Sequence, residues 1–95
     1  SQRIGPVGAG LRIALGNLDQ FRPTVGAAAL GLADSAMSLA IEHLRHRTQF
    51  GAPLAKQQGL RFDLAHLAAE HGAAQLLVYR AASMRDEGTA TSSDV

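Results

Sequence analysis

Residues 49–53, Gln49-Phe50-Gly51-Ala52-Pro53, separate two long segments in which apolar residues recur with the period of a helix. Gly51 suits a tight turn after a helix, and Pro53 suits the first turn of the next helix, where its missing N–H is not needed. Two long helices joined by such a short connection pack antiparallel. The sequence therefore predicts an all-α fold built on an antiparallel long helical hairpin.

The segment before this turn is expected to form a long helix that begins near residues 18–22 and ends near Thr48. One apolar stripe along it comprises Val25, Ala29, Leu32, Ala36, Leu39 and His43. A second, adjacent stripe comprises Leu30, Ala33, Met37, Ile41 and Leu44. A helix that is apolar on two faces normally lies inside a larger assembly. We therefore expect the hairpin to belong to an up-and-down four-helix bundle and to form a homo-oligomer.

A short leading helix is expected before the long one. Residues 11–18 place leucines and an alanine at the spacing of one helical face. Pro23 cannot donate a backbone hydrogen bond and is best tolerated in a first turn, so a new helix should begin just before it. Asp19 is positioned to cap that new helix.

The segment after the turn is predicted to form a second long helix from about Pro53 to Asp86. Its apolar face steps alternately by four and three residues through Leu60, Leu64, Leu67, His71, Ala74, Val78 and Ala81. Glycines and a proline crowd residues 1–10, which predicts a linker. The expected organisation is a linker over 1–10, a partial helical domain over 11–88, and a polar tail with few anchors over 89–95.

The composition excludes several classes of function. The 95 residues include no cysteine, so disulfides, thiolate metal sites and cysteine nucleophiles are excluded. A net charge of +1 gives no general attraction to nucleic acid or to an anionic membrane. No apolar run approaches the roughly 20 residues of a bilayer span, and the start lacks the apolar region of a signal peptide. We therefore expect no nucleic-acid partner, no membrane span and a cytoplasmic location.

The histidines and serines do not form a recognisable catalytic or metal-binding pattern. His43 and His46 are three residues apart on one helix, near the spacing at which two imidazoles can share a cation. No carboxylate stands in a matching position near His66 or His71 on the second helix. The serines lack the G-x-S-x-G elbow of a hydrolase nucleophile. The sequence thus predicts neither a metal site nor a catalytic residue.

Two polar clusters do not fit a purely structural role. The first, Leu18-Asp19-Gln20-Phe21-Arg22-Pro23, places an acid and a guanidinium beside a helix that is otherwise apolar. The second, residues 47–54 followed by Gln58, places a guanidinium, an aromatic ring and an amide at the junction of the two helices. The planar guanidinium fork is a usual partner for phosphate or carboxylate groups.

These clusters, in this order, resemble the start of the C-terminal helical domain of the acyl-CoA dehydrogenase family. The matching segments are Gly8 to Leu15, Leu18 to Arg22, Ala29 to Ala33, Arg47 to Gln58, Leu64-Ala65 and Tyr79 to Ala82. The most specific of them has the pattern R-x-Q-F-G-x-P-L-x-x-x-Q. The resemblance implies a partial C-terminal domain of an FAD-dependent oxidoreductase, less than a third of a typical member.

The second cluster is the cofactor site that this resemblance implies. In similar enzymes the Arg of R-x-Q-F-G contacts the FAD diphosphate across a subunit interface, and Arg47 matches it. Phe50 matches a residue that packs near the adenine end of the same FAD, and Gln58 matches one that hydrogen-bonds it. The resemblance thus implies a homo-oligomer in which this junction serves a neighbouring subunit.

The first cluster resembles the stretch that meets the acyl-CoA substrate. The implied substrate-binding residues are Asp19, Gln20, Phe21 and Arg22, with Asp19 and Arg22 as the polar contacts. The implied reaction is α,β-dehydrogenation of acyl-CoA thioesters, after which electrons pass to an electron-transfer flavoprotein or a similar acceptor.

The catalytic base of the family has no counterpart in these 95 residues. In most members it is a glutamate well downstream of the second long helix, beyond Val95. A minority place it immediately before the Arg of the first cluster, where this chain has Phe21, which cannot accept a proton. We therefore expect the chain alone to be inactive. The alternative is a non-enzymatic helical self-association module, which would show no saturable FAD site.

Overall fold

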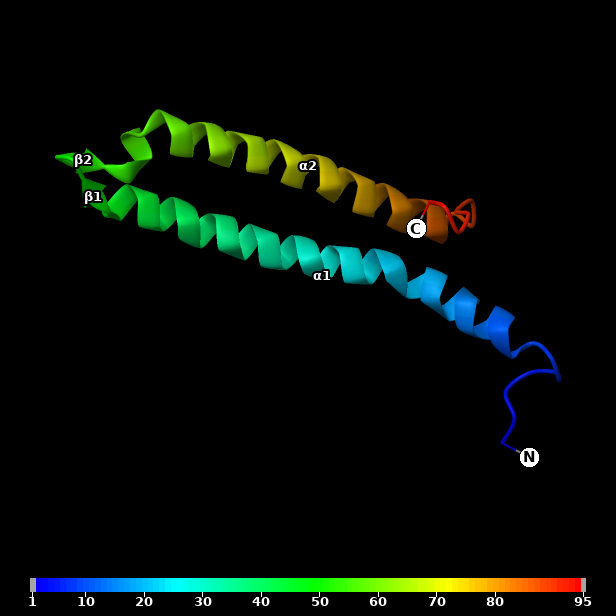
Figure 1. Cartoon of the computed structure of the whole chain (residues 1–95). Helices are drawn as coiled ribbons and strands as arrows, with labels where there is room; N and C mark the ends of the chain where they lie inside the picture. The colour runs from blue at the N-terminus through cyan, green and yellow to red at the C-terminus, as the bar shows by residue number, and fades with distance from the viewer. Residues whose placement is uncertain (1, 95) are drawn as a thin grey trace.

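The computed structural model describes residues 2–94 as an antiparallel helical hairpin with extents of 71 × 28 × 17 Å (Figure 1). Its elements are helix α1 (Gly10–His46), strands β1 (Thr48–Gln49) and β2 (Ala52–Pro53), the 3-10 helix η1 (Leu54–Lys56), and helix α2 (Gln58–Asp86). The two strands form a minimal antiparallel ladder at the turn. The predicted all-α hairpin is confirmed, and the second helix ends at Asp86 as expected.

Helix α1 is continuous, so the prediction of a separate leading helix is wrong. Residues 11–18 run on into the rest of α1, and Asp19 lies inside the helix instead of capping its start. Pro23 also lies inside α1, where it has no N–H to donate to the carbonyl oxygen of Asp19. One missing bond does not end a helix that keeps its bonds on both sides, but it bends it. Figure 1 shows α1 changing direction between its blue and cyan parts.

The side chains between the helices form what we call the interhelical seam, and those on α1 recur every seven residues. On α1 the half-buried seam residues are Pro23, Leu30, Met37 and Leu44, and on α2 they are Leu60, Leu64, His71, Ala74 and Val78. Seven-residue spacing is the pattern of two helices that pack along a shared stripe. The second stripe predicted for α1 therefore faces α2, and the alternating steps of four and three predicted for α2 mark its contact face.

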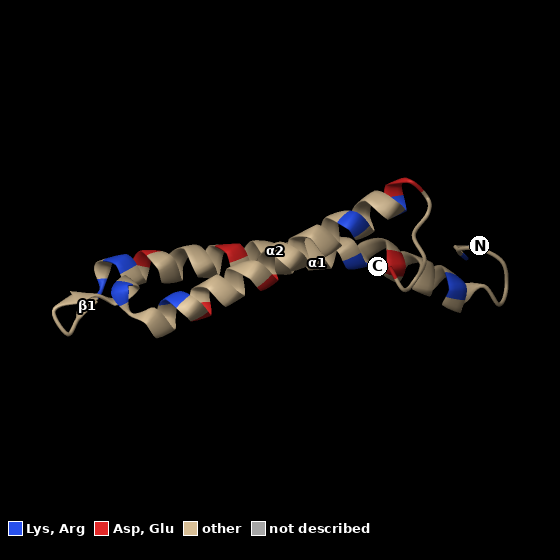
Figure 2. Cartoon of the chain, turned by 90° about the horizontal axis from the view of Figure 1, so that it is seen from above, with Lys and Arg blue, Asp and Glu red and all other residues tan. Residues whose placement is uncertain are grey.

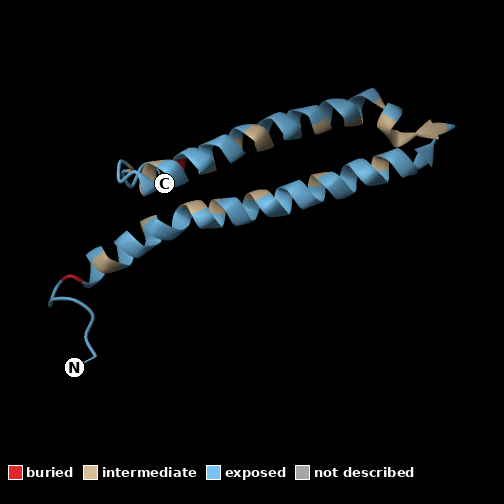
Figure 3. Ribbon diagram, turned by 180° about the vertical axis from the view of Figure 1, so that it is seen from behind, coloured by how far each residue is buried: buried red, intermediate tan, exposed pale blue. Residues whose placement is uncertain are grey.

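The first stripe of α1 is uncovered. Val25, Leu32 and Leu39 are 67%, 75% and 67% exposed. Within residues 2–94 only Ala9 and Ala81 are buried, and Figure 3 shows most of both helices in the colour of exposed residues. Two helices alone thus leave the wide apolar surface of α1 without a partner.

By length and composition α1 also meets the criteria for a helix that could cross a membrane. An 18-residue window within it reaches a mean hydropathy of 1.5. This differs from the expectation that no segment would approach a bilayer span. The central helix of a helical bundle meets the same criteria, so this finding does not by itself indicate a membrane.

The segment after α2 is held by hydrogen bonds, so the expectation of a tail with few anchors is wrong. Gly88 has a positive φ of 71°, which turns the chain back so that the N–H groups of Thr89 and Ala90 both donate to the carbonyl oxygen of Met84. Such a glycine is a common way to end a helix. Ser92 then contacts the amino-terminal part of α1. The returning chain places residues 89–94 beside the first polar cluster.

Candidate functional site

The tip of the hairpin combines backbone strain with an exposed aromatic ring. Thr48 pairs with Pro53 and Gln49 with Ala52, so Phe50 and Gly51 are the two central residues of the turn. Both have positive φ, 53° and 77°, which is the pattern of a type I′ hairpin turn. Gly51 adopts this conformation freely, whereas a bulky residue such as Phe50 is strained by it. The Phe50 side chain is nevertheless 88% exposed.

The backbone of Arg47 is held by two hydrogen bonds, while the residue is exposed. Its N–H donates to the carbonyl oxygen of His43 at 2.8 Å, and its own carbonyl oxygen accepts from the N–H of Leu54 at 2.8 Å. Among residues 2–94, no hydrogen bond or ion pair engages the Arg47 guanidinium. The position of the residue is thus determined by the helix end and the turn, while its charge remains available for a ligand.

Gln58, the first residue of α2, lines a shallow cavity next to the same junction. The cavity has a volume of about 450 Å³ and is also lined by Arg61, Phe62 and Ala65. Figure 2 shows several of the blue Lys and Arg residues gathered around the end labelled β1. These cations are Arg45, Arg47, Lys56 and Arg61, and no acidic residue lies in the first turn of α2. No ion pair is formed by these four cations within residues 2–94, so the junction offers positive charge together with an amide and two aromatic rings.

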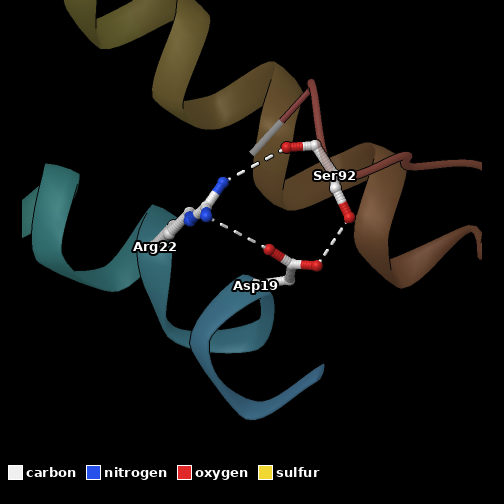
Figure 4. A network of polar contacts seen from close by, with 3 residues as sticks. All are labelled: Asp19, Arg22 and Ser92. Carbon is white, nitrogen blue, oxygen red and sulfur yellow. Dashed lines mark hydrogen bonds and ion pairs between the residues drawn. The ribbon is translucent and has the colours of Figure 1, made fainter. Parts of the chain in front are cut away.

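The first polar cluster lies toward the other end of the hairpin, where three side chains form a closed network (Figure 4). The Arg22 guanidinium forms an ion pair with Asp19, with 3.5 Å between Nη2 and Oδ1. The Ser92 hydroxyl donates to the other carboxylate oxygen of Asp19 at 2.6 Å, and Arg22 Nη1 donates to the Ser92 carbonyl oxygen at 3.2 Å. The side chain of Asp19 is only 19% exposed.

The remaining members of the first cluster are placed next to this network. Arg85, near the end of α2, donates to Gln20 Oε1 at 3.4 Å. The Phe21 side chain is 60% exposed. All four predicted substrate-binding residues thus lie on one turn of α1, and polar contacts from the carboxy-terminal part of the chain reach three of them.

Ser92 belongs to a tight turn closed by Thr91 and Asp94. The Thr91 N–H donates to Asp94 Oδ2 at 2.9 Å, and the Asp94 N–H donates to the Thr91 carbonyl oxygen at 3.0 Å. Hydrogen bonds from the Thr91 hydroxyl and N–H, assisted by the charge of Arg80, hold the pKa of the Asp94 carboxyl below its ordinary value. The turn is therefore formed with Asp94 ionised at neutral pH.

A second set of polar side chains lies in the middle of the seam. His71 Nε2 is 3.8 Å from Asp34 Oδ1 across the two helices. A cavity of about 290 Å³ next to them is also lined by Gln75 and Tyr79, which share a hydrogen bond of 3.2 Å. No group of three or more potential metal ligands occurs within residues 2–94. The pair links α1 to α2 and has no partner set suited to a cation.

The comparisons with known proteins agree with the ordered clusters. Residues 8–95 match the family model described as "Acyl-CoA dehydrogenase, C-terminal domain". The chain belongs to the acyl-CoA dehydrogenase family. It corresponds to part of the C-terminal domain of these enzymes, as the resemblance predicted.

Individual family members are similar to the chain in sequence, and one solved structure is similar to it in fold. An acyl-CoA dehydrogenase of Bacillus subtilis is 41% identical over 85 residues, which are 90% of this chain and 22% of that protein. An acryloyl-CoA reductase (NADH) of Anaerotignum propionicum is 40% identical over 85 residues, again 90% and 22%. The butyryl-CoA dehydrogenase structure from Megasphaera elsdenii matches with a TM-score of 0.91 and 42% identity, covering 95% of this chain and 24% of that one. The chain thus spans about a fifth to a quarter of the length of these relatives.

The two predicted sites lie far apart on this family's hairpin. Arg47, Phe50 and Gln58 are brought together at the turn, and Asp19 and Arg22 are brought together near the opposite end. Asp19 and Arg47 are 28 residues apart along α1, a rise of about 42 Å.

Sequence reasoning missed the contacts of Ser92 and Arg85 with the first cluster. Each residue is more than 60 positions from its partner, and neither belongs to a local motif. The available signal was Gly88, which predicts where α2 ends, but it does not predict the direction that the chain takes afterwards. These contacts depend on the tertiary fold.

Proposed function

We propose that the chain is part of an FAD-dependent enzyme that carries out α,β-dehydrogenation of acyl-CoA thioesters. The observation that carries this proposal is the hairpin tip, where Arg47 is fixed by its backbone with its guanidinium unpaired within residues 2–94. One relative is named acryloyl-CoA reductase, so the reaction class includes the reverse direction. Most of the matched names are dehydrogenases, which favours the oxidative direction.

The residues at the tip fit a flavin dinucleotide. A diphosphate needs a guanidinium without an internal partner, and Arg47 provides one. Phe50 would pack near the adenine end, and Gln58 would donate or accept a hydrogen bond from the start of α2. When bound, FAD supplies the acceptor for the hydride that leaves the β-carbon of the substrate. The chain's own contribution is to hold the dinucleotide.

The first cluster would bind the acyl-CoA thioester. Asp19 and Arg22 provide a carboxylate and a guanidinium in a fixed arrangement, and the exposed ring of Phe21 adds apolar surface. Because this cluster and the tip are about 42 Å apart, we propose that they serve flavins of two different subunits. This proposal agrees with the homo-oligomer that the resemblance implies, in which Arg47 reaches across an interface.

The electron acceptor follows from the resemblance, and the location follows from the expectation drawn from the composition. We propose an electron-transfer flavoprotein or a similar carrier as the acceptor, and a cytoplasmic location. The decisive experiment on function supplies the complete enzyme with acyl-CoA thioesters and an artificial electron acceptor. Formation of a trans-2-enoyl thioester is the expected product, and failure to convert any acyl chain length would refute the proposal.

The 95-residue chain by itself is expected to show no turnover. Phe21 stands where a minority of the family has its base, and the carboxylate that belongs to the substrate cluster, Asp19, is paired with Arg22 and Ser92. An assay of the purified chain with FAD, acyl-CoA thioesters and an artificial acceptor checks this. Turnover above the background of FAD alone would show that a base had been overlooked.

The uncovered stripe of α1 supports the second candidate function, self-association. We expect the isolated chain to form dimers or larger assemblies by multi-angle light scattering, because Leu32 and Leu39 are 75% and 67% exposed. Changing both to glutamate, a good helix former, should give a monomer with unchanged helical circular dichroism. A monomeric wild-type chain with cooperative unfolding would contradict this. Saturable FAD binding by the assembly favours the enzyme over a purely structural module.

A further inference from the structure

The first polar cluster is shaped by a residue that lies 73 positions away in the sequence, Ser92. We propose that Ser92 is a positioning residue, which fixes the Asp19 carboxylate and the Arg22 guanidinium in the orientation that an acyl-CoA thioester meets. The substrate role of the cluster rests on the proposed function. The structural role of Ser92 rests on the contacts in Figure 4.

The ion pair between Asp19 and Arg22 is not sufficient to fix its own geometry. Its N–O separation is 3.5 Å, longer than the 2.7–2.9 Å of a well-formed charge-assisted hydrogen bond. Pairs of this kind, three residues apart on one helix and partly exposed, contribute little stability. A second contact is therefore needed to hold the two side chains in one arrangement.

Ser92 supplies that contact from both of its polar groups. Its hydroxyl donates to Asp19 Oδ2 at 2.6 Å, within the range of a strong O–H to carboxylate bond. Its carbonyl oxygen accepts from Arg22 Nη1 at 3.2 Å. Asp19 and Arg22 thus contact one another, and each also contacts Ser92, which restricts the orientation of the guanidinium.

Ser92 is itself held in place, as a positioning residue must be. The turn that contains it is closed by the reciprocal backbone and side-chain bonds of Thr91 and Asp94, at 2.9 and 3.0 Å. The preceding residues are fixed to the end of α2 through the carbonyl oxygen of Met84. The end of α2 therefore determines where Ser92 lies relative to the first cluster on α1.

The neighbouring Ser93 provides a matched control. Its hydroxyl lies 2.8 Å from that of Thr91, so it belongs to the same turn but contacts neither Asp19 nor Arg22. Ser92→Ala and Ser93→Ala remove the same atom from adjacent positions. A difference between them reports the contacts of Ser92 rather than the integrity of the turn.

The structural part is tested by amide hydrogen exchange of residues 19–22 in the complete enzyme. We expect these amides to exchange faster in Ser92→Ala than in wild type or Ser93→Ala, because the cluster loses its anchor. Ser92→Thr keeps the hydroxyl and should restore the wild-type rate. Equal exchange in the two alanine variants would overturn the positioning role.

The functional part is tested by steady-state kinetics on the same variants. Ser92→Ala should raise KM for the acyl-CoA thioester about tenfold, the effect of one hydrogen bond to a charged group, with kcat and flavin content nearly unchanged. Unchanged flavin content is expected because Ser92 contacts Asp19 and Arg22, which are not among the predicted FAD contacts. Ser92→Thr should again restore the wild-type value.

These experiments distinguish a failure of the positioning role of Ser92 from a failure of the proposed function. Wild-type turnover with the same KM in Ser92→Ala and Ser93→Ala overturns the role of Ser92 and leaves the proposed function standing. Absence of acyl-CoA turnover in the wild-type enzyme overturns the proposed function and, with it, the substrate role of Ser92. A selective rise of KM in Ser92→Ala supports both.

Discussion

Arg47→Ala is expected to weaken FAD retention by about 10- to 150-fold in the complete enzyme, because it removes a charge-assisted contact worth about 1.5–3 kcal/mol. The backbone of Arg47 is bonded to His43 and Leu54, and these bonds do not need the side chain. The truncation should therefore leave the hairpin intact. Flavin content per subunit, measured from the visible absorbance after extensive dialysis, gives the effect.

Arg45→Ala is the matched control for this prediction. Arg45 lies in the last turn of α1, so its charge belongs to the same group of cations as Arg47 and also lies near the negative end of the helix dipole. It is not part of the R-x-Q-F-G pattern. Removal of the Arg45 side chain should lower FAD affinity only slightly, because it reduces only the overall positive potential at this end of the hairpin. Arg47→Lys should give an intermediate value, since it keeps the charge and loses the planar fork. Equal flavin occupancy in wild type and Arg47→Ala would refute the diphosphate contact.

The hairpin could be predicted from the sequence because its signals are local. Gly51 and Pro53 mark the turn, and the steps of four and three along α2 give its contact face directly. On α1 the pattern of apolar residues shows two stripes and offers no means of choosing between them. Seven-residue spacing does not make the choice, because Val25, Leu32 and Leu39 in one stripe are spaced like Leu30, Met37 and Leu44 in the other. Which stripe packs against α2 depends on how the two helices meet in the tertiary fold.

The interpretation of Pro23 was wrong because a proline is only a local signal. It removes one hydrogen bond and favours a helix start, but residues 11–18 already form a good helical face on its other side. The continuous helix keeps its apolar residues on both sides of Pro23, and the one missing hydrogen bond results in a bend. Asp19 thereby lies inside the helix, where its side chain pairs with Arg22 and Ser92 instead of capping backbone N–H groups.

The predicted site residues were found by motif, and the structure adds what the motif cannot give. The pattern R-x-Q-F-G includes Phe50, but only the structure shows that its backbone is strained and that the residue is also exposed. Strain at a bulky residue persists where the surrounding structure imposes it, and such positions are often functional. Phe50 is thus a place where stability and the proposed FAD contact make opposite demands.

Substitutions of Phe50 should therefore change stability and FAD binding in opposite directions. Phe50→Gly relieves a left-handed conformation that costs an ordinary residue roughly 1–2 kcal/mol, partly offset by the entropy of glycine, so the free energy of unfolding should rise by about 0.5–1 kcal/mol. The same change removes the aromatic ring that would pack near adenine. Stacking of this kind contributes about 1–3 kcal/mol, so FAD affinity should fall by about 5- to 150-fold.

A series at this one position separates the strain from the ring. Phe50→Ala loses the ring and keeps the strained backbone, so it should lose FAD affinity with no gain in stability. Phe50→Asn tolerates the left-handed region and should behave like Phe50→Gly, whereas Phe50→Tyr should keep both the strain and the binding. Thermal unfolding of the apoprotein and fluorescence titration with FAD give the two quantities. If Phe50→Gly raised stability and bound FAD as tightly as wild type, the strained ring would have no part in holding the cofactor. If FAD affinity fell in Phe50→Gly but not in Phe50→Ala, the backbone conformation rather than the ring would be what the cofactor requires.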